Sequence, residues 1–345
     1  MSQNQEINPI IIGISSRALF DMRAEHDIYV KKGEDAYRAH QRKHRDEPLK
    51  PGTVFQLVQK LMTLNEPDKK PRFEFILISK NDAETGHRVC ESIRQYGLTI
   101  PRAILSKDSV APDILKAFKV DLYLSRDEET VRNTLSAGIA AAQVYDPPVD
   151  FDHTAKPGVH FAFDGDRVLF GGASEAVFLE HGLDAFYAYE SAMLDKPMEF
   201  GPMARLLFKL SDIKNTFPKE DNPIRISLVT ARGETRALNT LALWGDKYVD
   251  AAYMLGHPSP LAMRVEKAPL LKAIGADIFF DDTKHHTDLS SKLLPTCWVP
   301  HIPSDTPVPS LSEIMNMKAA KDQDNAVQPP APAKKKRSGP KGPKA

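Results

Sequence analysis

The stretch His160-Phe-Ala-Phe-Asp-Gly-Asp-Arg-Val-Leu-Phe170 joins a short apolar run to two aspartates that flank a glycine. Its first four residues predict a buried strand, because the run is short, rich in aromatic residues and ends at a polar break. Carboxylates at the end of a buried strand are costly unless a cation or a proton compensates them. Asp164 and Asp166 therefore indicate either a site for a hard cation such as Mg²⁺, which prefers oxygen ligands, or an Asp-Gly hairpin turn.

Two further apolar runs in the second half of the chain end in polar residues. Residues 225–229 lead into Thr230-Ala231-Arg232, and residues 277–280 lead into Asp281-Asp282, with Lys267 between the two runs. Because the carboxyl ends of parallel strands meet at one edge of a sheet, we expect these side chains to converge with Asp164. The pattern gathers carboxylates, a hydroxyl and an ammonium in one place.

The order of apolar runs and amphipathic segments predicts an α/β protein. Residues 10–14, 73–78, 102–105 and 120–124 are expected strands, and helices are expected between them. The last expected helix of the first half covers residues 128–142, which are rich in alanine. Strands that alternate with helices of this size are typical of a parallel sheet.

Six short segments of the first half recur in order in the second half, at offsets of 149 to 156 residues. Such self-similarity predicts a tandem duplication of one α/β unit, although two unrelated α/β halves could share the same rhythm. We expect halves at residues 1–150 and 151–312. Residues 313–345 lose apolar periodicity and become rich in proline and lysine, which predicts a disordered tail.

Composition limits the class of protein. A hydrophobic content of 41% and a charged content of 27% are ordinary for a globular protein. The net charge is zero, but residues 334–344 hold six basic and no acidic side chains, so the remainder is mildly acidic, which disfavours nucleic-acid binding. No apolar run is long enough for a membrane helix or a signal peptide, and two distant cysteines form no disulfide framework. These features predict a cytoplasmic protein without a membrane partner.

The residues at the expected sheet edge suit phosphoryl transfer. Asp164 can attack phosphorus to form an aspartyl-phosphate, and Asp166 can protonate the leaving oxygen and later activate water. Asp281 or Asp282 can complete a Mg²⁺ site with Asp164. Thr230 and the N–H groups of the following turn can bind phosphate oxygens, and Lys267 can neutralise the charge that gathers there.

These motifs resemble those of the haloacid dehalogenase (HAD) superfamily of phosphatases, and more narrowly those of the cytosolic type I 5′-nucleotidases. The narrower resemblance rests on residues 15–21, 47–52, 162–166, 228–232 and 278–282. It implies a HAD-like Rossmannoid sheet with a helical cap, and Mg²⁺-dependent hydrolysis of nucleoside 5′-monophosphates, prominently AMP. It also implies metal ligation by Asp164, by the main-chain carbonyl of Asp166, and by Asp282 or Asp281.

The resemblance places the cap at about residues 173–217, where the aromatic side chains of Phe186 and Tyr187 could stack on a base or simply pack between helices. Ala231 and Arg232 would contact the substrate, although Arg232 could equally cap the strand edge. The basic tail could be a localisation signal, a polyanion contact or a solvated end.

The first half lacks the acidic motif. In the repeat alignment Ile14 takes the place of Asp164, and Ser16, Ser79, Ala111 and Ser125 take the places of Asp166, Thr230, Lys267 and Asp281. We expect this half to be non-catalytic: a scaffold, an interface or a site for an effector nucleotide such as ADP or ATP. Other hypotheses remain open, namely a phosphatase for another small phosphomonoester, or a non-catalytic nucleotide-binding regulator. A homo-oligomer is also compatible with the sequence.

Overall fold

The computed structural model describes residues 8–148, 157–232, 234–245, 248–256, 266–303 and 307–327. The chain forms two compact units. The first contains Met1–Ala173 and Asp195–Thr306, and the second contains Ser174–Leu194 and Pro307–Ala345. None of the helices in the described ranges is both long and apolar enough to cross a membrane.

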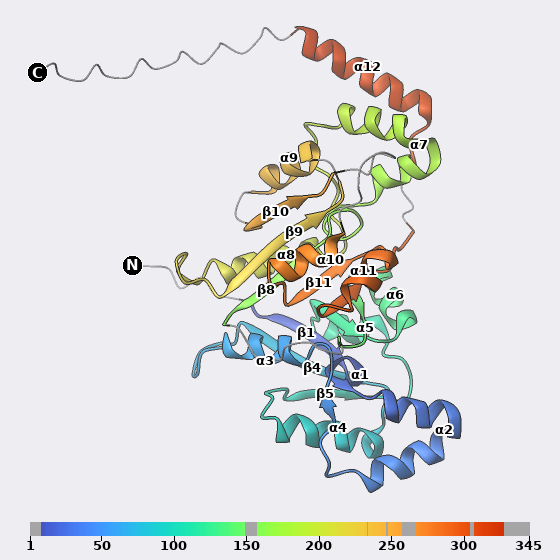
Figure 1. Ribbon diagram of the computed structural model, residues 1–345, viewed down its shortest axis with the longest axis vertical. Coiled ribbons are helices and arrows are strands. Elements are labelled where there is room, and N and C mark those ends of the chain that lie inside the picture. The colour runs from blue at the N-terminus through green and yellow to red at the C-terminus, as the bar shows by residue number, and fades with distance from the viewer. Residues whose placement is uncertain are drawn as a thin grey trace, which may run out of the picture. The chain divides into compact units, whose positions relative to one another are not determined.

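Ten described strands of the first unit form one sheet (Figure 1). Neighbouring strands are parallel, except for one antiparallel pair, β7 and β12, at the centre. In sheet order the strands are β10 (Ala251–Met254), β9 (Ile224–Thr230), β8 (Val159–Phe163), β11 (Ile278–Asp281), β12 (Thr296–Trp298), β7 (Ala140–Val144), β6 (Leu122–Ser125), β1 (Ile10–Ser15), β4 (Phe73–Ser79) and β5 (Arg102–Leu105).

Helices connect the strands of the sheet, as expected for parallel crossovers. In the first unit they are α1 (Ser16–Leu19), α2 (Arg23–Lys43), α3 (Phe55–Thr63), α4 (Ala83–Gln95), α5 (Pro112–Ala117), α6 (Glu128–Ser136), α8 (Ala204–Lys214), α9 (Glu234–Trp244), α10 (Lys267–Ala273) and α11 (Lys284–Ser290). A small antiparallel pair, β2 (Phe20–Asp21) and β3 (Lys50–Pro51), lies outside the main sheet. The mixed α/β class with a large, mostly parallel sheet is therefore confirmed.

The two halves of the sheet have the same strand order. In the first half β1 is flanked by β4 and β5 on one side and by β6 and β7 on the other. In the second half β8 is flanked in the same way by β9 and β10, and by β11 and β12. The halves meet through β7 and β12, whose antiparallel pairing relates them by an approximate two-fold axis.

Strand pairing corrects one position of the repeat alignment. The last residues of β1 and β8 that pair with β6 and β11 are Ile14 and Phe163, so these two residues are equivalent. The next residues are Ser15 and Asp164. Ser15, rather than Ile14, therefore stands where Asp164 stands, because a one-residue shift in a strand moves a side chain to the opposite face.

Reciprocal ion pairs join the two halves. Lys60 on α3 contacts Asp277 of the second half, with 2.6 Å between Nζ and Oδ1. Lys209 on α8 contacts Asp121 of the first half at 2.7 Å. Each aspartate also accepts a main-chain N–H bond from the first strand of its own half, from His160 at 2.8 Å and from Ile11 at 3.0 Å. Each half thus supplies one helix to the face of the other.

The predicted helix at residues 128–142 is wrong in its second part. Helix α6 ends at Ser136, and Gly138 adopts a φ of +80°, which glycine tolerates without strain. Residues 140–144 then form β7, with Ala140, Ala141 and Ala142 buried. Alanine favours helix locally, but here two neighbouring strands bond to its backbone and decide the conformation.

The second unit consists of α7 (Ala173–Ala192, whose first residue belongs to the first unit) and α12 (Leu311–Val327). Val177, Tyr189 and Ile314 pack in its apolar centre. The prediction of a disordered tail from residue 313 is wrong for residues 313–327, which lie in α12, and residues 328–345 lie outside the described ranges. The predicted cap range 173–217 is divided, because α8 belongs to the first unit.

Candidate active site

The carboxyl ends of three neighbouring strands place the predicted side chains together. Asp164 directly follows β8, Asp281 ends β11 and Thr230 ends β9, and β8 lies between the other two strands. Lys267 is the first residue of α10. Strands β8 and β11 are fully buried and β9 is buried except at Arg225, so their last residues are held at the sheet edge with little freedom to move.

The ammonium of Lys267 lies between two carboxylates. Its Nζ donates to Asp164 Oδ1 at 2.6 Å and to Asp281 Oδ2 at 2.7 Å. The side chains of all three residues are at most 7% exposed. Asp281 Oδ1 also accepts the main-chain N–H of Thr283 at 2.8 Å, which orients this carboxylate toward the lysine.

Burial dominates the electrostatics of this cluster. It raises the pKa of Asp164, and the negative charge of Asp281 adds to the rise, while Lys267 opposes it. Burial alone would lower the pKa of Lys267, but Asp164 and Asp281 outweigh it and raise this pKa. Lys267 therefore stays charged at neutral pH and opposes the rise in the pKa of Asp164.

The same cluster fits a divalent cation. Asp164, Asp281 and Asp282 each present a carboxylate oxygen, and these oxygens lie within 4.8 Å of one another. Three carboxylates against one ammonium leave an excess of negative charge in a buried place, which a hard divalent cation would offset. The donors are all oxygens, as such cations prefer.

Asp166 and Arg232, both predicted site residues, contact each other. Arg232 Nε lies 3.1 Å and 3.0 Å from the two carboxylate oxygens of Asp166. The main-chain N–H of Arg232 donates to Thr230 Oγ1 at 3.2 Å, which forms a tight turn around Ala231. The sequence did not predict the Asp166–Arg232 ion pair, because the two residues are 66 positions apart.

Three side chains near the cluster were not predicted from the sequence. Arg167 Nη1 lies 4.0 Å from Asp282 Oδ2, and Trp298 donates its indole N–H to the main-chain oxygen of Asp282 at 2.6 Å. His286 Nδ1 is buried without a hydrogen-bond partner among the described residues. Burial, with the positive charge of Lys267, lowers the pKa of His286 to about 4, so its ring is neutral at physiological pH.

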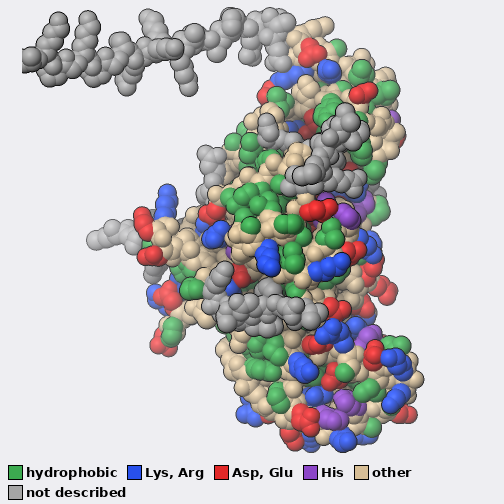
Figure 2. All heavy atoms as spheres, viewed as in Figure 1, with side chains coloured by type: hydrophobic (Ala, Val, Ile, Leu, Met, Phe, Trp, Pro, Cys, Tyr) green, Lys and Arg blue, Asp and Glu red, His purple; other side chains and the backbone are tan. Residues whose placement is uncertain are grey.

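Phe186 and Tyr187 lie on α7 in the second unit. Phe186 is buried and Tyr187 is half exposed, and their ring centroids are 5.6 Å apart. Their role in stacking on a base stays a prediction. On the face of the molecule shown in Figure 2, acidic and basic side chains are mixed over most of the described surface.

Comparison with known proteins places the chain among nucleotidases. It is 34% identical over 300 residues to human cytosolic 5′-nucleotidase 1B, a match that covers 83% of this chain. The chain spans about half the length of that relative, 48%.

Two solved structures resemble the chain only weakly, with low TM-scores. They are the HAD domain of a Legionella pneumophila effector protein, an inactive mutant (TM-score 0.28, 9% identity, 49% of this chain and 99% of that one), and a putative universal stress protein from Pseudomonas aeruginosa (TM-score 0.31, 12% identity, 92% and 99%).

A family model described as 5′-nucleotidase matches residues 1–306, which is most of the chain and includes every motif residue of the cluster. The fold, the buried Asp–Lys–Asp cluster and this match agree with the resemblance that the motifs alone predicted. The chain therefore belongs to the 5′-nucleotidase family.

Proposed function

We propose that this protein is a Mg²⁺-dependent 5′-nucleotidase that hydrolyses nucleoside 5′-monophosphates, with AMP as the preferred substrate. The observation that carries the proposal is the buried cluster in which Lys267 bridges Asp164 and Asp281. A structural role alone would not require it, since burying several charged groups is expensive and apolar residues would fill the same space at lower cost. The match to the 5′-nucleotidase family model supports the substrate class.

In the first step Asp164 attacks the phosphorus of the monophosphate. One carboxylate oxygen forms a bond to phosphorus, and the bond from phosphorus to the 5′ oxygen of the nucleoside breaks. Asp166 gives its proton to that leaving oxygen. In the second step water, whose proton passes to Asp166, attacks the phosphoryl group and releases inorganic phosphate and free Asp164.

The ion pair between Asp166 and Arg232 bears on this proton transfer. A neighbouring guanidinium favours the charged form of a carboxylate, which opposes its role as a general acid. A phosphate group offers Arg232 an alternative, bidentate partner. Arg232 would then move from Asp166 to the substrate, and Asp166 could hold the proton that the leaving oxygen needs.

The divalent cation would be held by Asp164 and Asp282, with Asp281 and the main-chain carbonyl of Asp166 as further candidates. When bound, it supplies positive charge against the phosphate oxygens. Lys267 favours the charged form of Asp164 and holds it in place, and Thr230 with the N–H groups after it would bind the remaining phosphate oxygens.

We also propose that the chain arose by tandem duplication and that its first half is a degenerate, non-catalytic HAD-like copy. The shared strand order and the reciprocal Lys–Asp pairs support this. The name of the human relative favours a cytosolic location.

The test is release of inorganic phosphate from AMP by the purified chain, with Mg²⁺ and with EDTA. We expect Asp164→Asn to reduce turnover by at least about a thousandfold, because the nucleophile is lost. Asp221→Asn, a change at an exposed loop aspartate of the same half, is the matched control and should keep full activity. Undiminished turnover by Asp164→Asn would refute the mechanism, and a substrate panel would show whether another phosphomonoester is preferred.

A further inference from the structure

The first half contains a cavity of about 420 Å³ at the carboxyl ends of β1, β4 and β6, next to α2. Its position in the sheet corresponds to that of the Asp164 cluster in the second half, because the two halves share one strand order. The volume lies within the roughly 300–1,000 Å³ range of small-molecule sites. The non-catalytic half thus keeps an open pocket where the other half keeps its catalytic residues.

The residues at equivalent positions differ in charge. In the second half Asp164, Lys267, Asp281 and Asp282 give three carboxylates and one ammonium, a formal charge of −2. The corresponding residues of the first half are Ser15, Ala111, Ser125 and Arg126 by strand register and helix position, with a formal charge of +1.

Hydroxyl and guanidinium groups bind phosphate oxygens directly, whereas a carboxylate cluster needs a cation between itself and phosphate. Ser79, which ends β4 as Thr230 ends β9, adds a further hydroxyl, and its Oγ donates to Ser16 Oγ at 3.0 Å.

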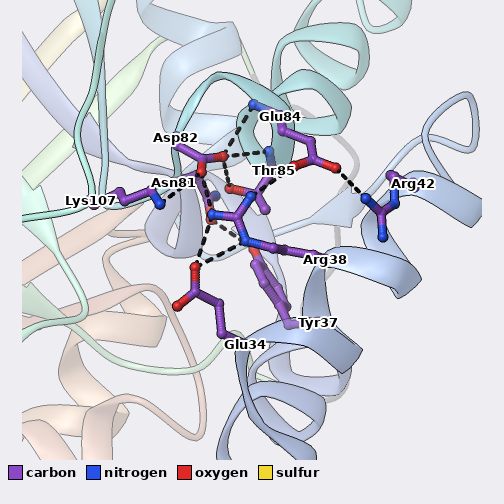
Figure 3. Close-up of polar contacts among 9 residues, drawn as sticks. All are labelled: Glu34, Tyr37, Arg38, Arg42, Asn81, Asp82, Glu84, Thr85 and Lys107. Atoms are coloured by element: carbon purple, nitrogen blue, oxygen red, sulfur yellow. Dashed lines mark hydrogen bonds and ion pairs between the residues drawn. The ribbon is translucent and has the colours of Figure 1, made fainter.

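Each carboxylate that lines the cavity already pairs with a basic side chain. Glu25 pairs with Arg88 at 2.9 Å, and Asp127 pairs with Lys80 at 3.0 Å. Figure 3 shows the guanidinium of Arg38 among the carboxylates on the α2 and α4 side of the cavity. These acids therefore do not repel an incoming anion as free carboxylates would.

Arg17 is the lining arginine that makes no ion pair or hydrogen bond with any residue in the described ranges. Arg126 also lines the cavity and bonds to Asp146 at 2.6 Å. Burial lowers the pKa of Arg17 and the positive charge of Arg126 lowers it further, while the negative charges of Asp127 and Asp146 offset this only in part. The guanidiniums of Arg17 and Arg126 repel each other, and an anion bound between them would reduce this repulsion.

Two aromatic rings line the same cavity. Tyr29 is half exposed and Tyr37 is buried, and their rings meet edge to face with centroids 5.9 Å apart. The hydroxyl of Tyr37 donates to Asn81 at 2.8 Å, which fixes the ring. A ligand that carries both a phosphate and a flat ring can contact the arginine and serine side chains with its phosphate and the tyrosine rings with its flat ring.

We propose that the first half holds a second, metal-independent binding site for a phosphate ester, in which Arg17, Arg126 and the serine hydroxyls bind the phosphate and Tyr29 contacts its organic part. The substitutions that removed the metal-binding carboxylates from this copy also made it attractive to phosphate without a metal. The site does not depend on catalysis in the second half.

The test is isothermal titration calorimetry of the full chain with AMP in EDTA. We expect one bound AMP per chain without metal, and binding weakened about tenfold or more in Arg17→Gln, because a charged hydrogen-bonding partner is lost. Arg94→Gln, at an exposed arginine of the same half that pairs with Glu91, is the matched control and should bind normally. Asp164→Asn should also bind normally, and this separates the new site from the catalytic cluster.

Parallel titrations with inorganic phosphate and with adenosine separate the two parts of the ligand. Phosphate that competes with AMP, with adenosine much weaker, supports recognition through the phosphate. The proposal fails if AMP does not bind in EDTA, or if Arg17→Gln binds as tightly as the unchanged chain. It also fails if Asp164→Asn loses the metal-free binding. A thermal melt of Arg17→Gln that matches the unchanged chain shows that the variant is folded.

Discussion

The two Lys–Asp pairs that join the halves occupy equivalent positions but differ in exposure, so they should differ in energy. The side chain of Lys60 is 9% exposed, whereas that of Lys209 is 40% exposed. Exposed pairs contribute about 0–1 kcal/mol, and loss of one partner of a buried pair costs about 3–5 kcal/mol. Since Asp277 is itself partly exposed, we expect a coupling free energy of about 2 kcal/mol for Lys60–Asp277 and below about 1 kcal/mol for Lys209–Asp121.

Double-mutant cycles measure both couplings. Lys60→Met and Lys209→Met keep the aliphatic stem, and Asp277→Asn and Asp121→Asn keep an oxygen that can accept the strand N–H bond. Urea denaturation gives the free energy of unfolding of each variant, after a test that the transition is two-state. Tryptophan fluorescence reports the second half, where both tryptophans lie. Equal couplings for the two pairs, or none for Lys60–Asp277, would refute the argument from burial.

Three further predictions concern single positions. Gly201→Ala should destabilise the fold by about 1–3 kcal/mol in urea denaturation, because a Cβ there would collide with two main-chain carbonyl oxygens. Gly97→Ala is the control for backbone strain alone, since a Cβ at Gly97 meets nothing within 4 Å although φ is +65°. A thiol reagent should modify Cys90, which is exposed, in the native chain and Cys297, which is buried, only after unfolding. Burial raises the pKa of both thiols, so access to the reagent is what separates them; two equally fast thiols would contradict this. In EDTA, NMR titration should give His286 a pKa near 4, and a pKa near 6.5 would contradict the placement of the ring. The free energy of unfolding should fall as the pH falls from about 6.5 toward 4, because the unfolded ring takes up a proton that the folded ring does not.

Much of the Asp164 cluster could be predicted from local patterns. Buried strands are short apolar runs, and the polar residue that ends each run in a parallel sheet faces the same edge. This reasoning was enough to bring Asp164, Thr230 and Asp281 together. The order of these motifs along the chain, with Lys267 between the last two, resembles that of the HAD superfamily, and residues 15–21 and 47–52 carry the narrower resemblance to the 5′-nucleotidases.

The contacts between distant segments could not be predicted in this way. The pairing of Asp166 with Arg232 depends on the turn after β9, and the ion pair of Lys60 with Asp277 depends on how the two halves meet. The one-residue error that aligned Ile14 with Asp164 arose because sequence similarity does not fix strand register, whereas main-chain pairing does.

The sequence by itself determined the alternation of strands and helices and the residues that meet in the Asp164 cluster, since these follow from apolar periodicity and residue type. Only the tertiary structure decided that residues 140–144 form a strand, that β7 and β12 join the halves into one sheet, and that the first half keeps a cavity. The physical reason is that helix propensity acts between residues close in sequence, whereas hydrogen bonds between strands depend on the tertiary structure. Local propensity favours helix for an alanine-rich segment, but it is outweighed by hydrogen bonds from β6 of the same half and from β12, which is distant in sequence.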